Sequence, residues 1–261
     1  MTGSTSATAQ LMPHSPFDST PALEAISLDE LNGVAALQSR VDRKYLLDND
    51  ALQRLVGGLA NGARLLEIDG QSQFDYSSVY FDTPDHALYL AAAYGRRRRF
   101  KVRTRHYEDS GLCLLEVKQK AQGRTVKTRL PYEAADRQRL TSPGLTYVSS
   151  VTEQPGICDR LQPVLTTRYR RQTLVDLQSR TRLTIDTDLR CTSDTSATAS
   201  LNMAVVETKT AGAAGPADRL LWSLGIRPVR ISKFGTALAA LNPHLPSNRW
   251  HRAVNVGWQT S

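Results

Sequence analysis

The sequence contains few cysteines, few aromatic residues and no long apolar run. Its three cysteines, Cys113, Cys158 and Cys191, are widely spaced in 261 residues, which fits neither a disulfide framework nor a zinc site. Aromatic residues make up only 7% of the chain, which argues against a platform that stacks nucleic-acid bases. The apolar runs are too short to cross a bilayer. We therefore expect a soluble protein of a reducing compartment, the cytoplasm, in which all three cysteines are structural.

Neither a secretory signal nor a second domain is visible in the sequence. Residues 1–16 lack a basic region followed by an apolar stretch, so they are not typical of a signal peptide. We expect a disordered leader over 1–25, one domain over 26–245 and a C-terminal tail over 246–261. Hydrophobic residues make up 40% of the chain, and β-barrels of this length often form a single unit. The chain therefore has enough apolar material for one core.

Acidic residues are outnumbered by basic ones. The chain has 33 Lys and Arg residues against 25 Asp and Glu residues, which gives a formal net charge of +8. Such a balance implies an anionic partner, but composition alone does not choose between nucleic acid, acidic lipid and a small polyanion. The placement of the charges along the predicted elements has to show which of these anions is the partner.

Helix, loop and strand signals can each be assigned to segments of the chain. Ser27 and Glu30 have the spacing of a capping box and open a short helix. Further helices are expected over 50–60, 86–94 and 217–225, and a proline precedes each of the last two. Segments rich in Ser, Thr, Gly or Pro are expected to form loops: 141–156, 192–200 and 211–215. Alternating segments are expected to form strands: 76–82, 99–107, 112–120, 124–132, 164–176, 180–190 and 203–209.

Charged residues gather on one face of five of these strands. Residues two apart in a strand point to the same face, so Lys101, Arg103 and Arg105 lie together while Phe100 and Val102 lie opposite. The same alternation groups further charged residues on one face of four later strands: Glu116, Lys118 and Lys120; Lys127 and Arg129; Arg182 and Asp186; Glu207 and Lys209.

A repeated cationic face favours a closed barrel over an open sheet. One charged face normally contacts solvent, but five in succession would place a dense field of like charge on one side of a sheet unless an anion filled it. Closure with these faces inward creates a cationic tunnel. The predicted fold is therefore α+β, an antiparallel closed β-barrel with a basic interior and with helices packed on the outside. The run Arg96–Arg99 cannot point inward as a whole, and we expect it to form a solvated turn or a non-specific anion-binding patch.

Short motifs follow one another in a specific order. They are Asp42-Arg-Lys44-Tyr45, Val79-Tyr-Phe-Asp-Thr-Pro84, Lys101-Val-Arg103-Thr-Arg105, Leu115-Glu-Val-Lys118, Tyr169-Arg-Arg171, Arg182-Leu-Thr-Ile-Asp186, Val206-Glu207-Thr-Lys209 and Ser232-Lys233-Phe234. No single motif is decisive, but the ordered set resembles the VTC domains, the polyphosphate polymerases of the triphosphate tunnel metalloenzyme superfamily. The resemblance covers roughly residues 38–242.

The resemblance implies a set of site residues. Glu207 is expected to hold a divalent metal, Mn²⁺ or Mg²⁺. Lys118, Arg182 and Lys233 are expected to be catalytic. Phosphate contacts are expected from Lys44, Arg103, Arg105, Lys118, Lys127, Arg171, Arg182, Arg230 and Lys233, with Arg129 as an alternative to Lys127.

The segment that matches the first strand of the family departs from the wider tunnel-enzyme signature of Glu, Glu and Lys. Arg40, Asp42 and Lys44 occupy that spacing here, which disfavours triphosphatases and cyclases that take two metal ligands from this strand. Glu116 and Asp186 are open to two interpretations, as helpers of the metal or as salt-bridge partners.

The implied reaction is ATP-dependent synthesis of polyphosphate inside the tunnel. The sequence shows no Ser-His-Asp arrangement, no Cys-His arrangement and no Gly-rich phosphate motif. The nucleophile is therefore expected to be a terminal phosphate oxygen of the growing chain. Two alternatives stay open: a metal-dependent triphosphate or polyphosphate hydrolase, and a non-catalytic polyphosphate-binding module. ATP and polyphosphate are the expected partners, nucleic acid is not, and coupling to a membrane would require a partner protein.

Overall fold

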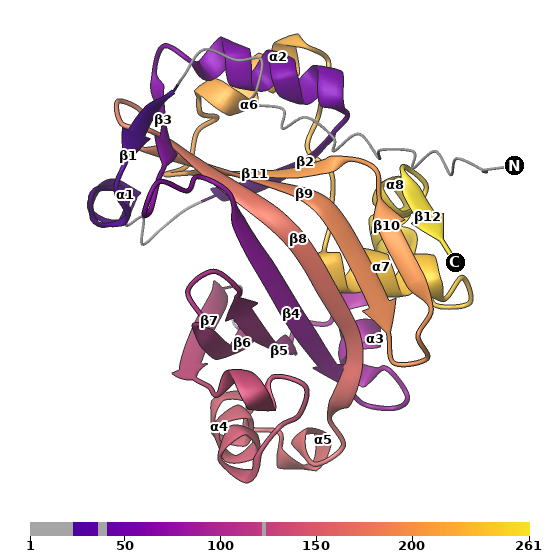
Figure 1. The fold of residues 1–261 in the computed structure, drawn as a ribbon. Helices are drawn as coiled ribbons and strands as arrows, with labels where there is room; N and C mark the ends of the chain where they lie inside the picture. The colour runs from indigo at the N-terminus through magenta and orange to yellow at the C-terminus, as the bar shows by residue number, and fades with distance from the viewer. Residues whose placement is uncertain (1–22, 36–40, 122–123) are drawn as a thin grey trace, which may run out of the picture.

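A computed structural model describes residues 23–35, 41–121 and 124–261 (Figure 1). The fold is α+β, and its strands belong to one twisted sheet. The strands are β1 (Glu24–Ile26), β2 (Val41–Leu47), β3 (Ala63–Leu66), β4 (Phe74–Asp82), β5 (Arg99–Tyr107), β6 (Cys113–Ala121), β7 (Arg124–Pro131), β8 (Gln162–Asp176), β9 (Thr181–Ser193), β10 (Thr198–Leu201), β11 (Ala204–Thr210) and β12 (Trp258–Thr260). The helices are α1 (Leu28–Ala35), α2 (Asn49–Leu59), α3 (Ala87–Ala93), α4 (Ser142–Thr152), α5 (Pro155–Cys158), α6 (Pro216–Ser223), α7 (Lys233–Leu241) and α8 (His251–Val254), with short 3₁₀ turns η1 (Ala134–Asp136) and η2 (Asn248–Trp250).

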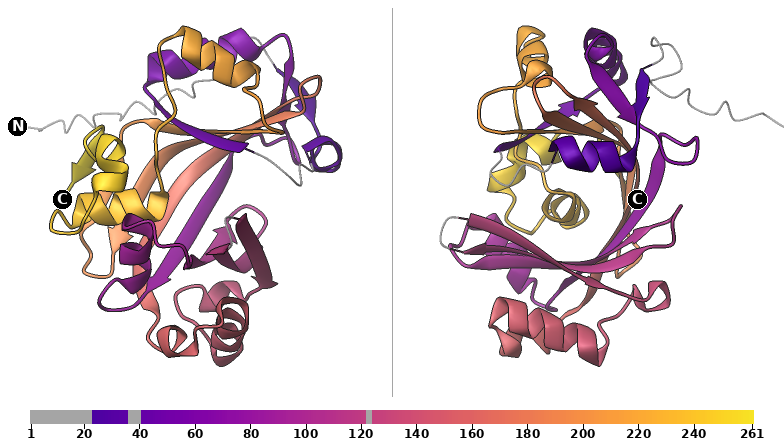
Figure 2. Two further views of the ribbon diagram at one scale, coloured as in Figure 1. Left: turned by 180° about the vertical axis from the view of Figure 1, so that it is seen from behind. Right: turned by 90° about the vertical axis from the view of Figure 1, so that its left-hand side faces the viewer.

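The sheet curls into a half-barrel around a concave face (Figures 1 and 2). Its curved body follows the order β7-β6-β5-β4-β8-β9, continues through β11 and ends at β2, and all these pairs are antiparallel. Within the described ranges, no strand pairing joins β2 to β7. The expected closure of the barrel is therefore not confirmed. Lys44 of β2, at one end of the sheet, and Lys118 of β6, next to the other end, line the same cavities.

Helices cover the outer face of the sheet in two places. On β2, β9 and β11 the residues Tyr45, Ile185 and Val206 point outward and pack under α2 and α6. On β5 and β6 the residues Val102 and Val117 pack in the same way under α4 and α5. Figure 1 shows these two helix pairs on opposite sides of the curved sheet. Since neighbouring residues of a strand point to opposite faces, the charged residues between these apolar positions must face the concave side.

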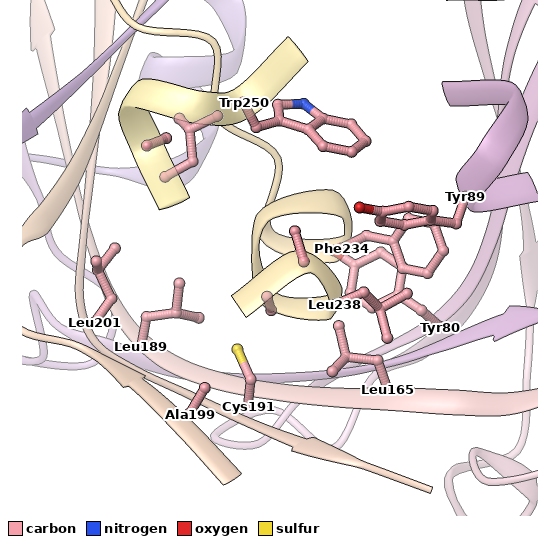
Figure 3. Packing of buried hydrophobic residues seen from close by; sticks show 14 of the residues in the cluster. Tyr80, Tyr89, Leu165, Leu189, Cys191, Ala199, Leu201, Phe234, Leu238 and Trp250 are labelled. Carbon is pink, nitrogen blue, oxygen red and sulfur yellow. The ribbon is translucent and has the colours of Figure 1, made fainter. Parts of the chain in front are cut away.

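A third apolar cluster fills one end of the concave face. Helix α7 lies there, and Phe234 stacks on Tyr80 of β4 with 5.2 Å between ring centroids. Trp250 packs against Tyr89 of α3 at 5.4 Å (Figure 3). Residues 246–261, expected as a tail, contribute η2, α8 and β12, and β12 pairs with β10. The C-terminal segment thus takes part in the packing that surrounds the cavity.

Several sequence-based expectations are confirmed. All seven predicted strands occur, as β4 to β9 and β11. The three later predicted helices occur as α2, α3 and α6. The capping box forms, since Ser27 N donates to Glu30 Oε2 at 3.0 Å and Glu30 N donates to Ser27 Oγ at 3.3 Å. The leader expected over 1–25 falls mainly on residues 1–22, outside the described part of the chain.

Two predicted loops were wrong in whole or in part. Segment 141–156 contains α4 and the start of α5, because Thr141 caps the helix by accepting from Gly144 N at 3.4 Å and Val148 is fully buried. Segment 192–200 contains the end of β9 and most of β10. These elements were missed because they are rich in Ser, Thr, Gly and Pro. The same residue types are common in loops and at the starts of helices and edge strands, so their presence does not distinguish the two.

Candidate phosphate-binding site

Two adjoining cavities open on the concave face. We call the smaller, of about 190 Å³, the inner chamber, and the larger, of about 570 Å³, the vestibule. Their linings share Asp42, Lys44, Lys101, Lys118 and Ser232, so the two spaces are continuous. The inner chamber is lined by Asp42, Lys44, Tyr80, Lys101, Arg103, Arg105, Glu116, Lys118, Lys127, Arg171, Glu207, Lys209, Ser232 and Lys233. The vestibule is lined by Asp42, Arg43, Lys44, Ala92, Arg99, Phe100, Lys101, Lys118, Gln119, Lys120, Thr125, Pro228, Val229, Arg230, Ile231, Ser232, Arg249 and Trp250.

The register of β5, β6 and β7 aligns basic residues across three strands. Lys101 lies opposite Lys118, and Lys118 lies opposite Lys127. Like charges directly opposite each other in a sheet are destabilising. The neighbouring row carries Arg103, Glu116 and Arg129 in the same order, so its central carboxylate separates two cations. The first row has no such counterion within the row, which is the arrangement expected where an anion binds.

Glu116 is the acidic centre of the β5–β7 wall. Its side chain is only 1% exposed, and Arg103 Nε donates to its Oε2 at 2.8 Å. Lys127 forms an ion pair with the other oxygen, and Arg105 Nε approaches to 4.0 Å. Burial alone would raise the pKa of Glu116, but the charges of Arg103, Arg105 and Lys127 outweigh it and lower this pKa to about 2. Glu116 therefore stays ionised and holds these basic side chains in place.

Asp186 plays the same part on β8 and β9. Arg171 grips it with two hydrogen bonds, from Nε at 2.6 Å and from Nη2 at 2.8 Å. Lys233, the first residue of α7, forms a further ion pair with Asp186. Burial opposes ionisation of Asp186, but these two cations hold its pKa well below the ordinary value. The contact ties the N-terminus of α7 to the wall of the inner chamber.

Glu207 of β11 is the third carboxylate of the site and is partly exposed. Lys44 Nζ lies 3.4 Å and Lys209 Nζ 3.1 Å from its two oxygens. Its side chain keeps 19% of its surface exposed to the cavity. Burial raises its pKa, but Lys44 and Lys209 outweigh this effect and hold the pKa far below the ordinary value. Glu207 is thus a permanently charged oxygen donor at the cavity surface.

Several basic side chains of the inner chamber lack enough hydrogen-bond acceptors or negative charge around them. Burial and the charge of Lys44 lower the pKa of Lys101 to about 7, and its Nζ donates to Ser232 Oγ at 2.7 Å. Burial and the charge of Arg103 lower the pKa of Lys127 to about 7 despite its pairing with Glu116. Arg105 Nε is buried and, in the described residues, has no hydrogen-bond acceptor. A bound phosphate would supply the acceptors and negative charge that these groups lack.

The structure brings most of the residues proposed from sequence to one place. Arg230 lines the vestibule instead of the inner chamber. Arg129 and Arg182 are absent from both linings: Arg129 lies 3.5 Å from Glu116 with 57% of its side chain exposed, and Arg182 lies opposite Lys209 in the strand register. The inner chamber is lined by eight of the residues proposed for phosphate or metal: Lys44, Arg103, Arg105, Lys118, Lys127, Arg171, Glu207 and Lys233.

Some residues of the inner chamber were not proposed from sequence. Lys101 and Lys209 share the strand faces of proposed residues, so the alternation held a signal for them. Tyr80 and Ser232 had no signal of this kind: Tyr80 Oη accepts from Arg103 Nη1 at 2.9 Å, and Ser232 caps α7 by accepting from Gly235 N at 3.2 Å. Their roles depend on contacts between distant segments, which alternation does not show.

The carboxylates of the site could supply only part of the coordination sphere of a metal ion, so a bound ligand would have to supply the rest. Within the described residues, no group of three or more His, Cys, Asp or Glu side chains is placed to hold an ion. Asp42 and Glu207 both line the inner chamber, and Glu116 is taken up by its basic neighbours. Mg²⁺ is commonly bound through one or two carboxylates together with substrate phosphates. The donor set fits a divalent ion that arrives with a phosphorylated ligand.

The fold and the site define a class of protein: an α+β half-barrel whose concave face carries a cavity lined mostly by Lys and Arg. The chain belongs to the VTC domain family, whose model matches residues 39–242. Among curated proteins none matches this chain. In the part of the chain that the structure describes, no helix has the length and apolar character needed to cross a membrane.

Solved structures match this chain at low sequence identity. A candidate adenylyl cyclase from Hippeastrum with a dominant triphosphatase activity is 14% identical, with 76% of this chain and 94% of that chain covered and a TM-score of 0.49. A candidate adenylate cyclase from Bacillus halodurans is 16% identical, with coverage of 74% and 94% and a TM-score of 0.48. An RNA triphosphatase from S. pombe, solved with the Spt5 CTD, is 10% identical, with 86% of each chain covered and a TM-score of 0.25.

Proposed function

We propose that this protein is an ATP-dependent polyphosphate polymerase, which transfers the γ-phosphoryl group of ATP to the end of a polyphosphate chain held in the inner chamber. Membership of the VTC domain family supports phosphoryl chemistry on triphosphates. One observation carries the finer proposal. The inner chamber is lined by nine Lys or Arg side chains and three carboxylates, and it continues into a second basic cavity that a longer polyanion would occupy.

The chamber suits a reaction that needs positioning and charge neutralisation. Phosphoryl transfer passes through a loose transition state that spreads charge over the equatorial oxygens. Arg103 and Arg171 are held by Glu116 and Asp186 with their guanidinium groups at the chamber wall, so little reorganisation is needed when phosphates bind. Lys118 lies beside Lys44 and supplies a more adjustable point charge. In this proposal a terminal phosphate oxygen of the chain attacks the γ-phosphorus of ATP, the bond from that phosphorus to the β–γ bridging oxygen breaks, and ADP leaves.

Glu207, together with Asp42, would hold a divalent ion. When bound, Mg²⁺ or Mn²⁺ would neutralise charge on the nucleotide phosphates. Glu207 contacts Lys44 and Lys209 in this structure. When the ligand enters, these two ammonium groups would leave Glu207 and bind phosphate oxygens, and Glu207 would bind the divalent ion. This accounts for a carboxylate that is ionised, partly exposed and surrounded by cations.

Substitution of the chamber lysine and of an expected catalytic arginine tests the proposal. Lys118→Ala should lower the turnover of ATP into polyphosphate by about 10²-fold or more, since Lys118 lines the inner chamber and would stabilise the transferring group directly. Arg182→Ala should lower turnover by a smaller factor, because Arg182 lines neither cavity and acts on the chamber through Lys209, which lies opposite it. Arg190→Ala is the matched control, because Arg190 lies on the same strand as Arg182 but is exposed and lines neither the inner chamber nor the vestibule. Thermal melting of each variant separates lost activity from lost folding. Normal turnover in both Lys118→Ala and Arg182→Ala would overturn the proposal.

A further inference from the structure

The vestibule contains a cluster of arginines that the proposed reaction does not use. Arg99 begins β5, Arg230 lies in the segment before α7, and Arg249 belongs to η2. All three line the vestibule and none lines the inner chamber. Three segments that are far apart in the sequence therefore bring positive charge to one space beside the proposed reaction site.

The guanidinium groups of Arg99 and Arg249 meet at Gly95. Arg99 Nη1 donates to Gly95 O at 3.3 Å. Arg249 Nη1 lies only 2.9 Å from the position that a Cβ atom would take on Gly95, and Gly95 has a φ of +68°. A side chain at position 95 would collide with Arg249, so this glycine both adopts the left-handed conformation and makes room for the second guanidinium group.

The cluster lacks negative partners. In the described residues, neither Arg230 nor Arg249 forms a hydrogen bond or an ion pair with another side chain, and Asp42 is the one carboxylate among the described residues that line the vestibule. Partial burial, together with the charges of Arg99 and Arg230, lowers the pKa of Arg249. Converging like charges of this kind are unfavourable unless an anion occupies the space between them.

Packing holds Arg249 in this position. The next residue, Trp250, is only 4% exposed and packs over α7 and against Tyr89 (Figure 3). A Cβ atom on Gly235 of α7 would lie 2.5 Å from the Trp250 ring, so the helix and the indole are in close contact. Arg249 also lies beyond residue 242, where the match to the family ends. The C-terminal segment therefore adds to the vestibule a fixed charge that the family match does not include.

We propose that the vestibule is a second binding site for inorganic polyphosphate, in which Arg99, Arg230 and Arg249 hold the part of the chain remote from its reacting end. The identity of the polyanion rests on the proposed function, but the site itself follows from the charge cluster. A nucleobase is the less suitable occupant, because Phe100 and Trp250, the aromatic residues among the described lining, are each 4% exposed and offer little surface for stacking.

The test compares a long ligand with a short one. Equilibrium binding of long-chain inorganic polyphosphate, of inorganic triphosphate and of a non-hydrolysable ATP analogue is measured for the full chain, for Arg249→Gln and for Arg230→Gln. Each variant should bind the long chain about tenfold more weakly, the cost of one charge-assisted contact, with unchanged affinity for triphosphate. Arg252→Gln is the matched control, since Arg252 lies three residues further on, is exposed and lines neither cavity.

Three results would overturn this inference. One is an unchanged affinity for the long chain in both variants, and another is an equal loss for triphosphate, which would place the arginines in the inner chamber. The third is a loss of affinity for a non-hydrolysable ATP analogue alone, which would make the vestibule a nucleotide site. Because binding is measured without turnover, a protein that makes no polymer yet binds long chains through Arg249 would contradict the proposed function and leave the second site standing.

Discussion

Replacement of Glu116 by Gln is expected to make the empty protein less stable and more dependent on an anionic ligand. The substitution keeps the shape of the side chain but removes the charge that pairs with Arg103 and Lys127. The interactions of Glu116 lower its pKa from 4.5 to about 2. This difference corresponds to stabilisation on the order of 3 kcal/mol at neutral pH, within the range known for breaking a buried ion pair by removing one partner.

The assay is thermal unfolding with and without inorganic triphosphate. For a domain of this size, the loss should lower the Tm by about 6–12 °C. Triphosphate should raise the Tm of Glu116→Gln more than that of the unaltered protein, because the bound anion replaces the missing charge. The pKa of Glu116 is depressed, so its contribution is present above pH 4.5 and is lost as the pH falls toward 2. The difference in stability between the two proteins should therefore shrink over this interval.

A matched control separates this effect from the general loss of a charge. Asp188 pairs with Arg170 at the surface, where both side chains are about 40% exposed, and Asn tolerates its left-handed backbone conformation at φ 53°. Asp188→Asn should cost less than about 1 kcal/mol and should not alter the response to triphosphate. An equal Tm change in both variants, or a Glu116→Gln protein that gains no more from triphosphate than the unaltered one, would refute the reasoning.

Three further predictions concern pH and packing. The pKa values of Lys101 and Lys127 are about 7, so raising the pH from 7 to 9 removes positive charge from the empty chamber. Calorimetry should show weaker triphosphate binding coupled to proton uptake; a pH-independent affinity would contradict this. Asp218→Ala should lower the free energy of chemical unfolding by about 3 kcal/mol or more, because this fully buried carboxylate accepts hydrogen bonds from two hydroxyl groups and a backbone N–H. A decrease of less than about 1 kcal/mol would contradict this prediction. Gly235→Ala should destabilise by about 1–3 kcal/mol through overlap with Trp250, and unchanged melting would show that the indole can move aside.

Alternation along the strands made the cationic face predictable. A strand has a fixed period of two, so the sequence around Lys101, Arg103 and Arg105 indicates which side chains share a face without any knowledge of the partner strands. Alternation does not indicate how far along the strand a cavity extends. Arg182 and Asp186 share a face of β9, yet neither lines the inner chamber, whereas Lys209, which lies opposite Arg182 on β11, does.

Features that depend on long-range contacts could not be predicted. Closure of the sheet is decided by whether β2 pairs with β7, and no local pattern records this. Helix α4 was missed because its buried residues, Gly144, Val148 and Thr152, are small or β-branched and include only one large apolar side chain, so they give a weak apolar period. Arg249 lies in a segment expected to be a tail. Its position at the vestibule follows from the packing of Trp250 on α7.

The central claim is that the inner chamber joins phosphates from ATP into a chain. The most direct measurement incubates the purified protein with ATP and Mn²⁺ or Mg²⁺ and follows polyphosphate on a gel together with released phosphate, with Glu207→Ala in parallel. The account predicts a metal-dependent ladder of polyphosphate that is absent from Glu207→Ala. Free phosphate without a ladder would contradict it in favour of a hydrolase, and neither product together with tight polyphosphate binding would contradict it in favour of a binding module.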